Sequence, residues 1–167
     1  MNNFTVDDIK QSVDYQWRMW IAKSTLNRWL LLSAVLFFIL FIIMSRNPDQ
    51  VPARLTEFLI FFVAYGLPSV VVALYAFCKA KKLLRNYIFY SQHEVQLTSP
   101  QNSYLYHGSI YFVVKVKVST CSLWVKTNPC FSSLLFSKFK LYAYNNRKVV
   151  GLYDNVTDKF YVIKRVD

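Results

Sequence analysis

The chain has 167 residues, about the length of one domain. It is 54% apolar and 18% aromatic, and its 20 Lys and Arg against 9 Asp and Glu give a formal net charge of +11. This apolar content excludes an intrinsically disordered chain, and only three glycines and five prolines exclude collagen-like or low-complexity sequence. A small membrane protein that carries a basic domain fits the composition.

Residues 1–28 predict a cytoplasmic amphipathic helix. Thr5 is followed three residues later by Asp8, which is a capping signal at a helix N-terminus. Two partners stay open for the apolar stripe that follows: the membrane interface, which favours tryptophan beside basic residues, or protein, either the C-terminal domain or a second copy. The stripe recurs at helical spacing, at Val6, Ile9, Val13, Trp17 and Trp20.

Two uncharged apolar runs, residues 29–44 and 58–77, determine the class of the protein. A helix rises about 1.5 Å per residue, so the second run is about 30 Å long and crosses a bilayer core. The first run is a little shorter, and Arg28 extends it by snorkelling to the headgroups. A soluble all-α core is disfavoured because its helices are rarely apolar on every face. A signal peptide is disfavoured because no small-x-small site follows the first run. We predict membrane helices over 29–45 and 58–77.

The polar connection at residues 46–57 is short, so the two spans are expected to form an antiparallel hairpin. It carries two basic residues, whereas three lie shortly before the first span and four lie in the basic segment 78–85 after the second. Because basic residues concentrate on the cytoplasmic side, both termini are predicted to be cytoplasmic. Gly66 and Pro68 predict a kink in the second span, either a local bend or a gating hinge.

Residues 86–167 predict an all-β domain, either an antiparallel barrel or a sandwich. The clearest strand is Ser109–Val118, in which apolar residues alternate with Tyr111, Lys115 and Lys117. Seven weaker strands are separated by turn residues, among them a predicted turn over Ser99–Asn102. About eight short strands favour a barrel or sandwich. The weaker strands are Tyr87–Tyr90, Glu94–Thr98, Tyr104–Tyr106, Ser122–Lys126, Phe139–Tyr144, Val149–Tyr153 and Phe160–Val166.

The predicted β domain is both basic and aromatic. It has ten Lys and Arg against four Asp and Glu, and it holds nine of the twelve tyrosines. Basic side chains interleaved with aromatic rings bind anionic ligands that carry bases, through phosphate contacts and ring stacking. The alternative is a solvated strand face beside anionic lipid headgroups, which attract a basic domain. The candidate ligand-binding residues form two groups, Tyr111, Lys115 and Lys117 on one strand face, and Lys138, Lys140, Tyr142 and Tyr144 on another.

The residue types that catalysis and metal binding require are sparse. Cys78, Cys121 and Cys130 form no C-x-x-C pair and are expected to be reduced on the cytoplasmic side. Cys121 and Cys130, together with His93 and His107, have the ligand types of a metal site but not its spacing. The three glycines leave no phosphate-binding loop or dinucleotide fingerprint. We therefore expect a protein that is not an enzyme and that uses no metal and no cofactor.

The layout of a membrane hairpin at 29–77 followed by a basic β domain at 86–167 resembles the small two-transmembrane effectors of bacterial anti-phage systems. The resemblance covers the whole chain as architecture and assigns no individual binding residue. It implies an inner-membrane effector of abortive infection whose β domain senses a signal, whose spans perturb the bilayer and whose copies assemble into a homo-oligomer. In one group of these effectors the partner is a reverse transcriptase with its DNA product, and in another the ligand is a cyclic nucleotide.

Two other functions stay open on the sequence. A structural or adaptor subunit would dock its hairpin and β domain on a larger membrane complex, such as a secretion machine. A non-toxic, membrane-anchored module would bind an anionic ligand or lipid without acting on the membrane.

Overall fold

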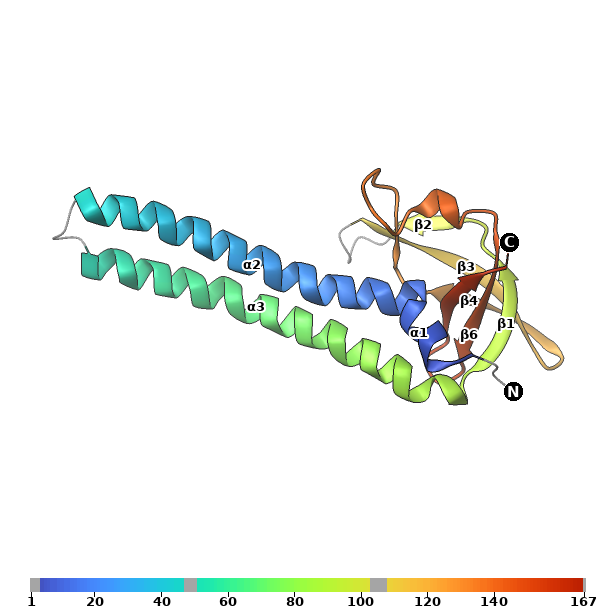
Figure 1. Cartoon of the computed structure of the whole chain (residues 1–167). Coiled ribbons are helices and arrows are strands. Elements are labelled where there is room, and N and C mark those ends of the chain that lie inside the picture. The colour runs from blue at the N-terminus through green and yellow to red at the C-terminus, as the bar shows by residue number, and fades with distance from the viewer. Residues whose placement is uncertain (1–3, 47–50, 103–107, 167) are drawn as a thin grey trace. The chain divides into compact units, whose positions relative to one another are not determined.

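A computed structural model describes residues 4–46, 51–102 and 108–166 (Figure 1). Contacts within the chain divide it into two compact units. We call them the sheet unit and the helical unit. The sheet unit combines Met1–Trp17 with Ala80–Asp167, and the helical unit is Arg18–Lys79.

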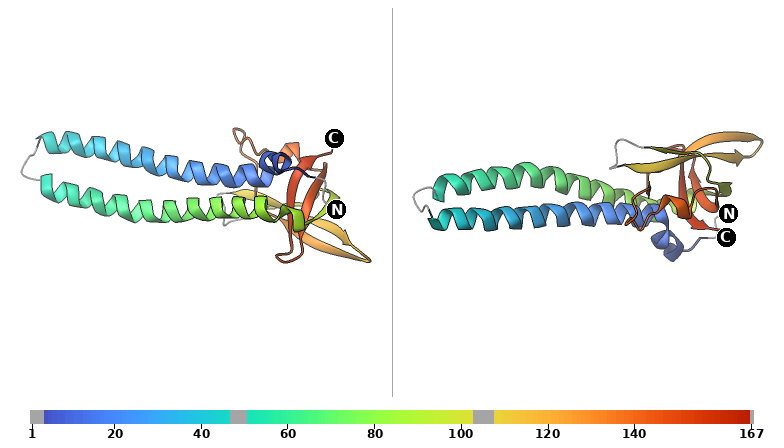
Figure 2. Two further views of the ribbon diagram at one scale, coloured as in Figure 1. Left: turned by 60° about the horizontal axis from the view of Figure 1, so that its bottom comes forward. Right: turned by 90° about the horizontal axis from the view of Figure 1, so that it is seen from above.

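The helical unit is an antiparallel pair formed by parts of α2 (Val13–Arg46) and α3 (Val51–Asn86) (Figures 1 and 2). Aromatic rings join the two helices, and the ring centroids of Trp29 and Phe62 are 4.7 Å apart. Gly66 permits this close approach, because a Cβ added there would lie 2.7 Å from Cζ2 of Trp29. The two helices are long and apolar enough to cross a membrane.

Both predicted apolar runs are helical, and the helices are longer than the runs. The predicted loop over 46–57 is too long, because α2 extends to Arg46 and α3 begins at Val51. Pro52 lies in the first turn of α3, where proline is tolerated. Residues 47–50 lie outside the described residues.

The predicted kink residues lie inside one long helix. Pro68 falls within α3, which continues across it and through the basic segment 78–85 to Asn86. Gly66 is buried against the Trp29 ring, so its small size has a packing reason that the kink interpretation did not include.

The N-terminal helix is capped as predicted but is shorter. α1 covers Val6–Gln11, and Thr5 and Asp8 form the capping box. The chain then breaks at Ser12, whose hydroxyl donates to the Ile9 carbonyl at 2.6 Å and accepts from Tyr15 N at 3.3 Å. Ser12 therefore closes α1 and opens α2, because serine side chains compete with helical backbone bonds.

Ile9, Val13 and Trp17 of the predicted stripe are buried within the protein, whereas Val6 is 44% exposed and Trp20, in the helical unit, is 37% exposed. Protein is therefore the partner of most of the stripe inside the sheet unit. Ile9 is completely buried in a cluster with Leu152 and Ile163 of the sheet. Asp14 Oδ2 accepts a hydrogen bond from Val162 N at 2.8 Å, across 148 positions of sequence. Trp17 is 6% exposed and meets Phe139 edge-on, with centroids 5.0 Å apart.

The seven strands described in the sheet unit form one open, mixed sheet. The predicted β-sheet domain is therefore confirmed, but of its two predicted forms, barrel or sandwich, the closed antiparallel barrel is wrong. Its order is β1-β6-β7-β4-β3-β2, with β5 paired to β3. All pairs are antiparallel except β4 with β7, where Lys126 lies opposite Lys159. The strands are β1 Ser91–Gln96, β2 Pro100–Asn102, β3 Ser109–Val118, β4 Cys121–Thr127, β5 Phe131–Ser132, β6 Lys148–Asp154 and β7 Lys159–Arg165.

The strongest periodic signal is confirmed, and so are four of the seven weaker ones, because β1, β4, β6 and β7 overlap the strands predicted at 94–98, 122–126, 149–153 and 160–166. Two other weak predictions fail where tertiary packing decides. β3 has the predicted bounds, with Ile110, Phe112, Val114 and Val116 buried. Predicted strands at 87–90 and 139–144 are instead short 3-10 helices, η2 (Tyr87–Phe89) and η3 (Leu141–Ala143). The predicted turn over Ser99–Asn102 contains β2, and β5 was not predicted. The predicted strand Tyr104–Tyr106 lies outside the described residues.

Candidate functional site

One surface of the β3–β4 hairpin gathers lysines and aromatic rings. The antiparallel register places Lys115 opposite Trp124, Lys117 opposite Ser122 and Val113 opposite Lys126. Directly paired residues share a face of the sheet, and the other face of β3 is buried. We call this exposed surface the basic ladder. Its members are Tyr111, Lys115, Lys117, Trp124 and Lys126.

Two of the three lysines of the basic ladder lie beside its rings. Lys115 Nζ is 5.9 Å from the centre of the Trp124 ring, and Lys126 Nζ is 5.7 Å from the centre of the Tyr111 ring. Trp124 is 69% exposed. The Tyr111 hydroxyl donates to Gln101 Oε1 of β2 at 2.9 Å, which fixes this ring at the side of the ladder.

The basic ladder has the chemistry of a site for phosphates and planar rings. Within the described part of the chain, its three lysines form no ion pairs. Their ammonium groups are therefore available to an anion. The exposed indole of Trp124 offers a stacking face next to them. Sequence reasoning placed Tyr111, Lys115 and Lys117 together, and it missed Trp124 and Lys126 because only the strand register brings these two alongside.

The second predicted group does not share a strand face. Residues 138–144 form a loop and η3 instead of a strand. Ser132 N donates a hydrogen bond to the Phe139 carbonyl at 2.8 Å, and the chain turns after this contact. Tyr144 packs against Phe131, with ring centroids 5.1 Å apart, and burial raises the pKa of its hydroxyl. Its ring is thus removed from a stacking site. Lys138, Lys140 and Tyr142 remain at the surface, with Lys140 Nζ 5.4 Å from the Tyr142 ring.

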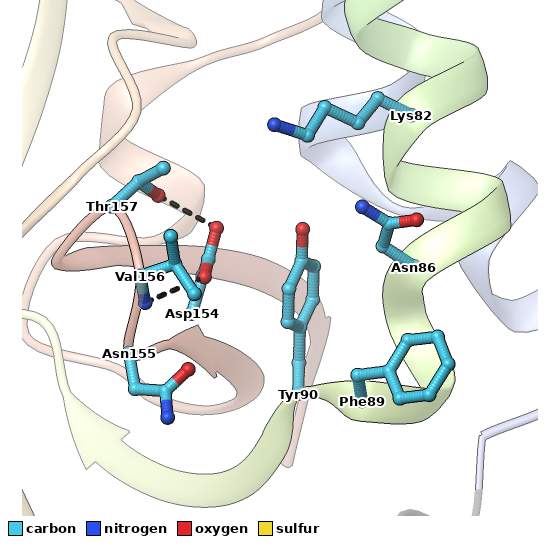
Figure 3. Close-up of a pocket in the computed structure, with 8 residues that line it drawn as sticks. All are labelled: Lys82, Asn86, Phe89, Tyr90, Asp154, Asn155, Val156 and Thr157. Carbon is cyan, nitrogen blue, oxygen red and sulfur yellow. Dashed lines mark hydrogen bonds between the residues drawn. The ribbon is translucent and has the colours of Figure 1, made fainter.

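A pocket of about 270 Å³ lies within the sheet unit (Figure 3). Lys82 and Asn86 reach in from the end of α3, and Tyr90 lies between them and the opposite wall (Figure 3). Asp154 at the end of β6 and Thr157 in the turn that follows form that wall. The complete lining is Lys82, Asn86, Phe89, Tyr90, Asp154, Asn155, Val156 and Thr157.

The buried carboxylate of this pocket, Asp154, already accepts hydrogen bonds from the turn that follows it. Asp154 is 2% exposed, and it accepts hydrogen bonds from Val156 N at 2.9 Å and Thr157 Oγ1 at 2.7 Å. Burial raises the pKa of Asp154, but hydrogen bonds from Thr157, Val156 and Tyr90 outweigh it, and the pKa lies below its usual value. Burial and then the Asp154 charge raise the pKa of Tyr90. The network holds the β6–β7 turn and the end of α3 together.

The described residues contain no group of three or more His, Cys, Asp and Glu side chains suited to a metal ion. Cys130 is buried, whereas Cys78 and Cys121 are exposed. No known protein family matches the chain, and comparisons with curated proteins and with solved structures find no match.

Proposed function

We propose that this chain is a two-pass membrane protein whose sheet unit binds an anionic, base-bearing ligand on the basic ladder. The observation that carries the proposal is the alternation of Lys115 and Lys126 with Trp124 and Tyr111 across two paired strands. Phosphates would meet the ammonium groups, and bases would stack on the exposed indole.

Membrane anchoring is supported by where the helical unit carries its apolar side chains. Leu31 is 68% exposed and Ile60 is 65% exposed. Only 6% and 11% of the most apolar windows of the two helices are buried. Side chains of this kind need an apolar surrounding. The excess of basic residues outside the connection between the helices favours cytoplasmic termini, and the anti-phage resemblance favours the bacterial inner membrane.

The output we propose is the effector activity that the architecture suggests. Ligand binding, or loss of an inhibitory partner, lets sheet units cluster into a homo-oligomer, and the clustered helices then perturb the membrane. A cyclic nucleotide and the DNA product of a reverse transcriptase both have the phosphates and bases that the basic ladder suits.

Ligand binding is tested on the full chain in lipid nanodiscs. The probes are a cyclic dinucleotide and a fluorescein-labelled single-stranded oligodeoxynucleotide, with binding followed by anisotropy. Trp124→Ala should weaken binding about tenfold, since stacking contributes about 1–3 kcal/mol per base. Lys115→Gln and Lys126→Gln should weaken it and make it less sensitive to salt. Lys148→Gln, which removes the same charge from an exposed position on β6, is the control. If all four variants bind the probes with the affinity of the wild type, the ladder is ruled out as the site.

Effector activity is tested separately by inducible expression in bacteria with a dye for membrane potential. Depolarisation in the presence of the ligand, lost in Trp124→Ala, is the expected result. Normal growth and potential with a ligand that binds in vitro would reject the effector and leave an anchored binding module.

A further inference from the structure

The loop between β5 and η3 carries three large apolar side chains outward. Leu134 is 67% exposed, Leu135 is 78% exposed and Phe136 is fully exposed. They are consecutive, so they form one apolar tip rather than scattered surface residues. We call them the apolar tip. Isolated exposed leucines are common on protein surfaces, but a contiguous exposed apolar group on the sheet unit needs an explanation.

Part of the backbone around the tip is hydrogen-bonded within the loop itself. Ser137 N donates to the Leu134 carbonyl at 3.1 Å, and Leu134 N donates to Ser132 Oγ at 3.2 Å. Phe139 N in turn donates to Ser137 Oγ at 3.2 Å. Backbone groups that enter an apolar phase without partners are costly. The two serines reduce this cost by bonding backbone N–H groups inside the loop.

The base of the loop is held by the core. Phe131 is completely buried and Phe139 is 6% exposed, and Ser132 N is bonded to the Phe139 carbonyl at 2.8 Å. The turn is therefore closed at its base, and its exposed side chains are not the result of an unpacked segment. A pre-formed tip loses less conformational entropy when it is buried by a partner.

A basic and aromatic collar follows the tip. Lys138 is exposed, Lys140 is half-buried, and Tyr142 is 69% exposed with the Lys140 ammonium 5.4 Å from its ring. Apolar side chains bordered by lysine and tyrosine match the layered chemistry of an anionic membrane surface, where acyl chains lie beneath charged headgroups. Protein interfaces, by contrast, are depleted of lysine.

We propose that the apolar tip inserts into the headgroup and acyl boundary of the anionic leaflet, while Lys138 and Lys140 bind lipid phosphates. This rests on the proposed anchoring of α2 and α3. Tethering to a bilayer gives the sheet unit a high local concentration of lipid surface, so a weak three-residue insertion suffices. A second copy is a poorer occupant, because three side chains fall well short of the roughly 800 Å² per partner of a stable interface.

The test places one environment-sensitive NBD fluorophore on the full chain in nanodiscs that contain phosphatidylglycerol. Cys78→Ser and Cys121→Ser remove the exposed thiols, and Cys130 is buried. The label is then attached at Phe136→Cys. Val156→Cys, 86% exposed on another loop, is the aqueous control, and Phe38→Cys, 64% exposed within the apolar run 29–44 of α2, is the membrane control.

We expect the label at position 136 to be quenched by doxyl-labelled lipid and shielded from iodide, as at position 38, whereas position 156 is quenched by iodide. Lys138→Glu with Lys140→Glu should shift position 136 towards the behaviour of position 156. Each labelled protein must melt at the temperature of the unlabelled chain, which excludes misfolding as the cause.

The outcomes separate the loop from the anchor. Lipid quenching at 38 with iodide quenching at 136 would overturn the loop proposal and leave the anchor standing. Shielding of 136 from both quenchers would also overturn it, because protein would then cover the tip. Lipid quenching at 136 that survives the double charge reversal would overturn the role of the two lysines. Iodide quenching at 38 would reject the anchoring itself.

Discussion

The two units of this chain place the same residue types in opposite surroundings. In the helical unit Leu31 and Phe38 are 68% and 64% exposed, whereas in the sheet unit Leu152 and Phe112 are completely buried. The sheet unit thus has its own apolar core, and the helical unit lacks one large enough to cover its side chains. The difference indicates that the helices take their apolar surrounding from outside the chain. Within the sheet unit, the apolar tip departs locally from this pattern of buried apolar side chains.

A matched pair of phenylalanine truncations should show this contrast most strongly. Phe112 is completely buried and lies edge-on to Phe131, with centroids 5.0 Å apart, so Phe112→Ala should lower the free energy of unfolding by about 3–5 kcal/mol. Phe38→Ala removes the same atoms from an exposed position of α2 and should change it far less. Thermal melts of both variants in detergent micelles measure the difference. Equal losses would show that Phe38 packs as a core residue and would break the comparison.

Substitution of the buried carboxylate Asp154 in the sheet unit should have the next largest effect on the free energy of unfolding. Asp154→Asn weakens two hydrogen bonds to a charged acceptor, from Val156 N and Thr157 Oγ1, and should cost about 1.5–3 kcal/mol. The pKa of Asp154 is lower in the folded chain than the usual 3.8. Its contribution is therefore present above pH 3.8 and is lost as the pH falls through the folded pKa.

Melting temperatures of the wild-type and Asp154→Asn chains between pH 7 and pH 3 test this sign. The wild type should lose its advantage over the variant as the pH falls below the ordinary carboxyl range. An advantage that grows on acidification would contradict the pKa direction.

The helical unit should be most sensitive where its helices touch. Gly66→Leu would drive a side chain into the Trp29 ring, because even a Cβ there lies 2.7 Å from Cζ2. Overpacking of this kind costs about 1–3 kcal/mol. Ala64→Leu places the same side chain at an exposed position of α3 and is the control. Disulfide crosslinking between engineered cysteines on α2 and α3 measures the pairing, and Trp29→Ala should rescue Gly66→Leu. Equal crosslinking of both leucine variants would contradict the close contact.

The accuracy of the sequence predictions followed the range of the interactions. β3 was predicted within its bounds because five apolar residues alternate without interruption, which is a local signal. The parallel pairing of Lys126 with Lys159 joins distant segments and has no local signature, so the open mixed sheet was not foreseen. Trp124 is part of the candidate site only because the strand register places it opposite Lys115. Tyr144 is not part of it because its ring packs against Phe131. The serine at position 12 was a local signal that the helix prediction overlooked.

The smallest effect should come from the exposed ion pair at the start of α3. Arg54 Nη1 lies 2.8 Å from Glu57 Oε2, and the two side chains are 41% and 61% exposed. Exposed pairs contribute little because water and salt screen them, so Glu57→Gln should change the free energy of unfolding by less than about 1 kcal/mol. The proposed orientation of the two helices in the membrane should not change either. Acidic residues contribute little to that orientation, and the substitution adds no basic residue. Thermal melts and labelling of a cysteine placed in the connection between the helices measure the two quantities. A variant that melts several degrees lower would show that this end of α3 is packed against something that screens it from water.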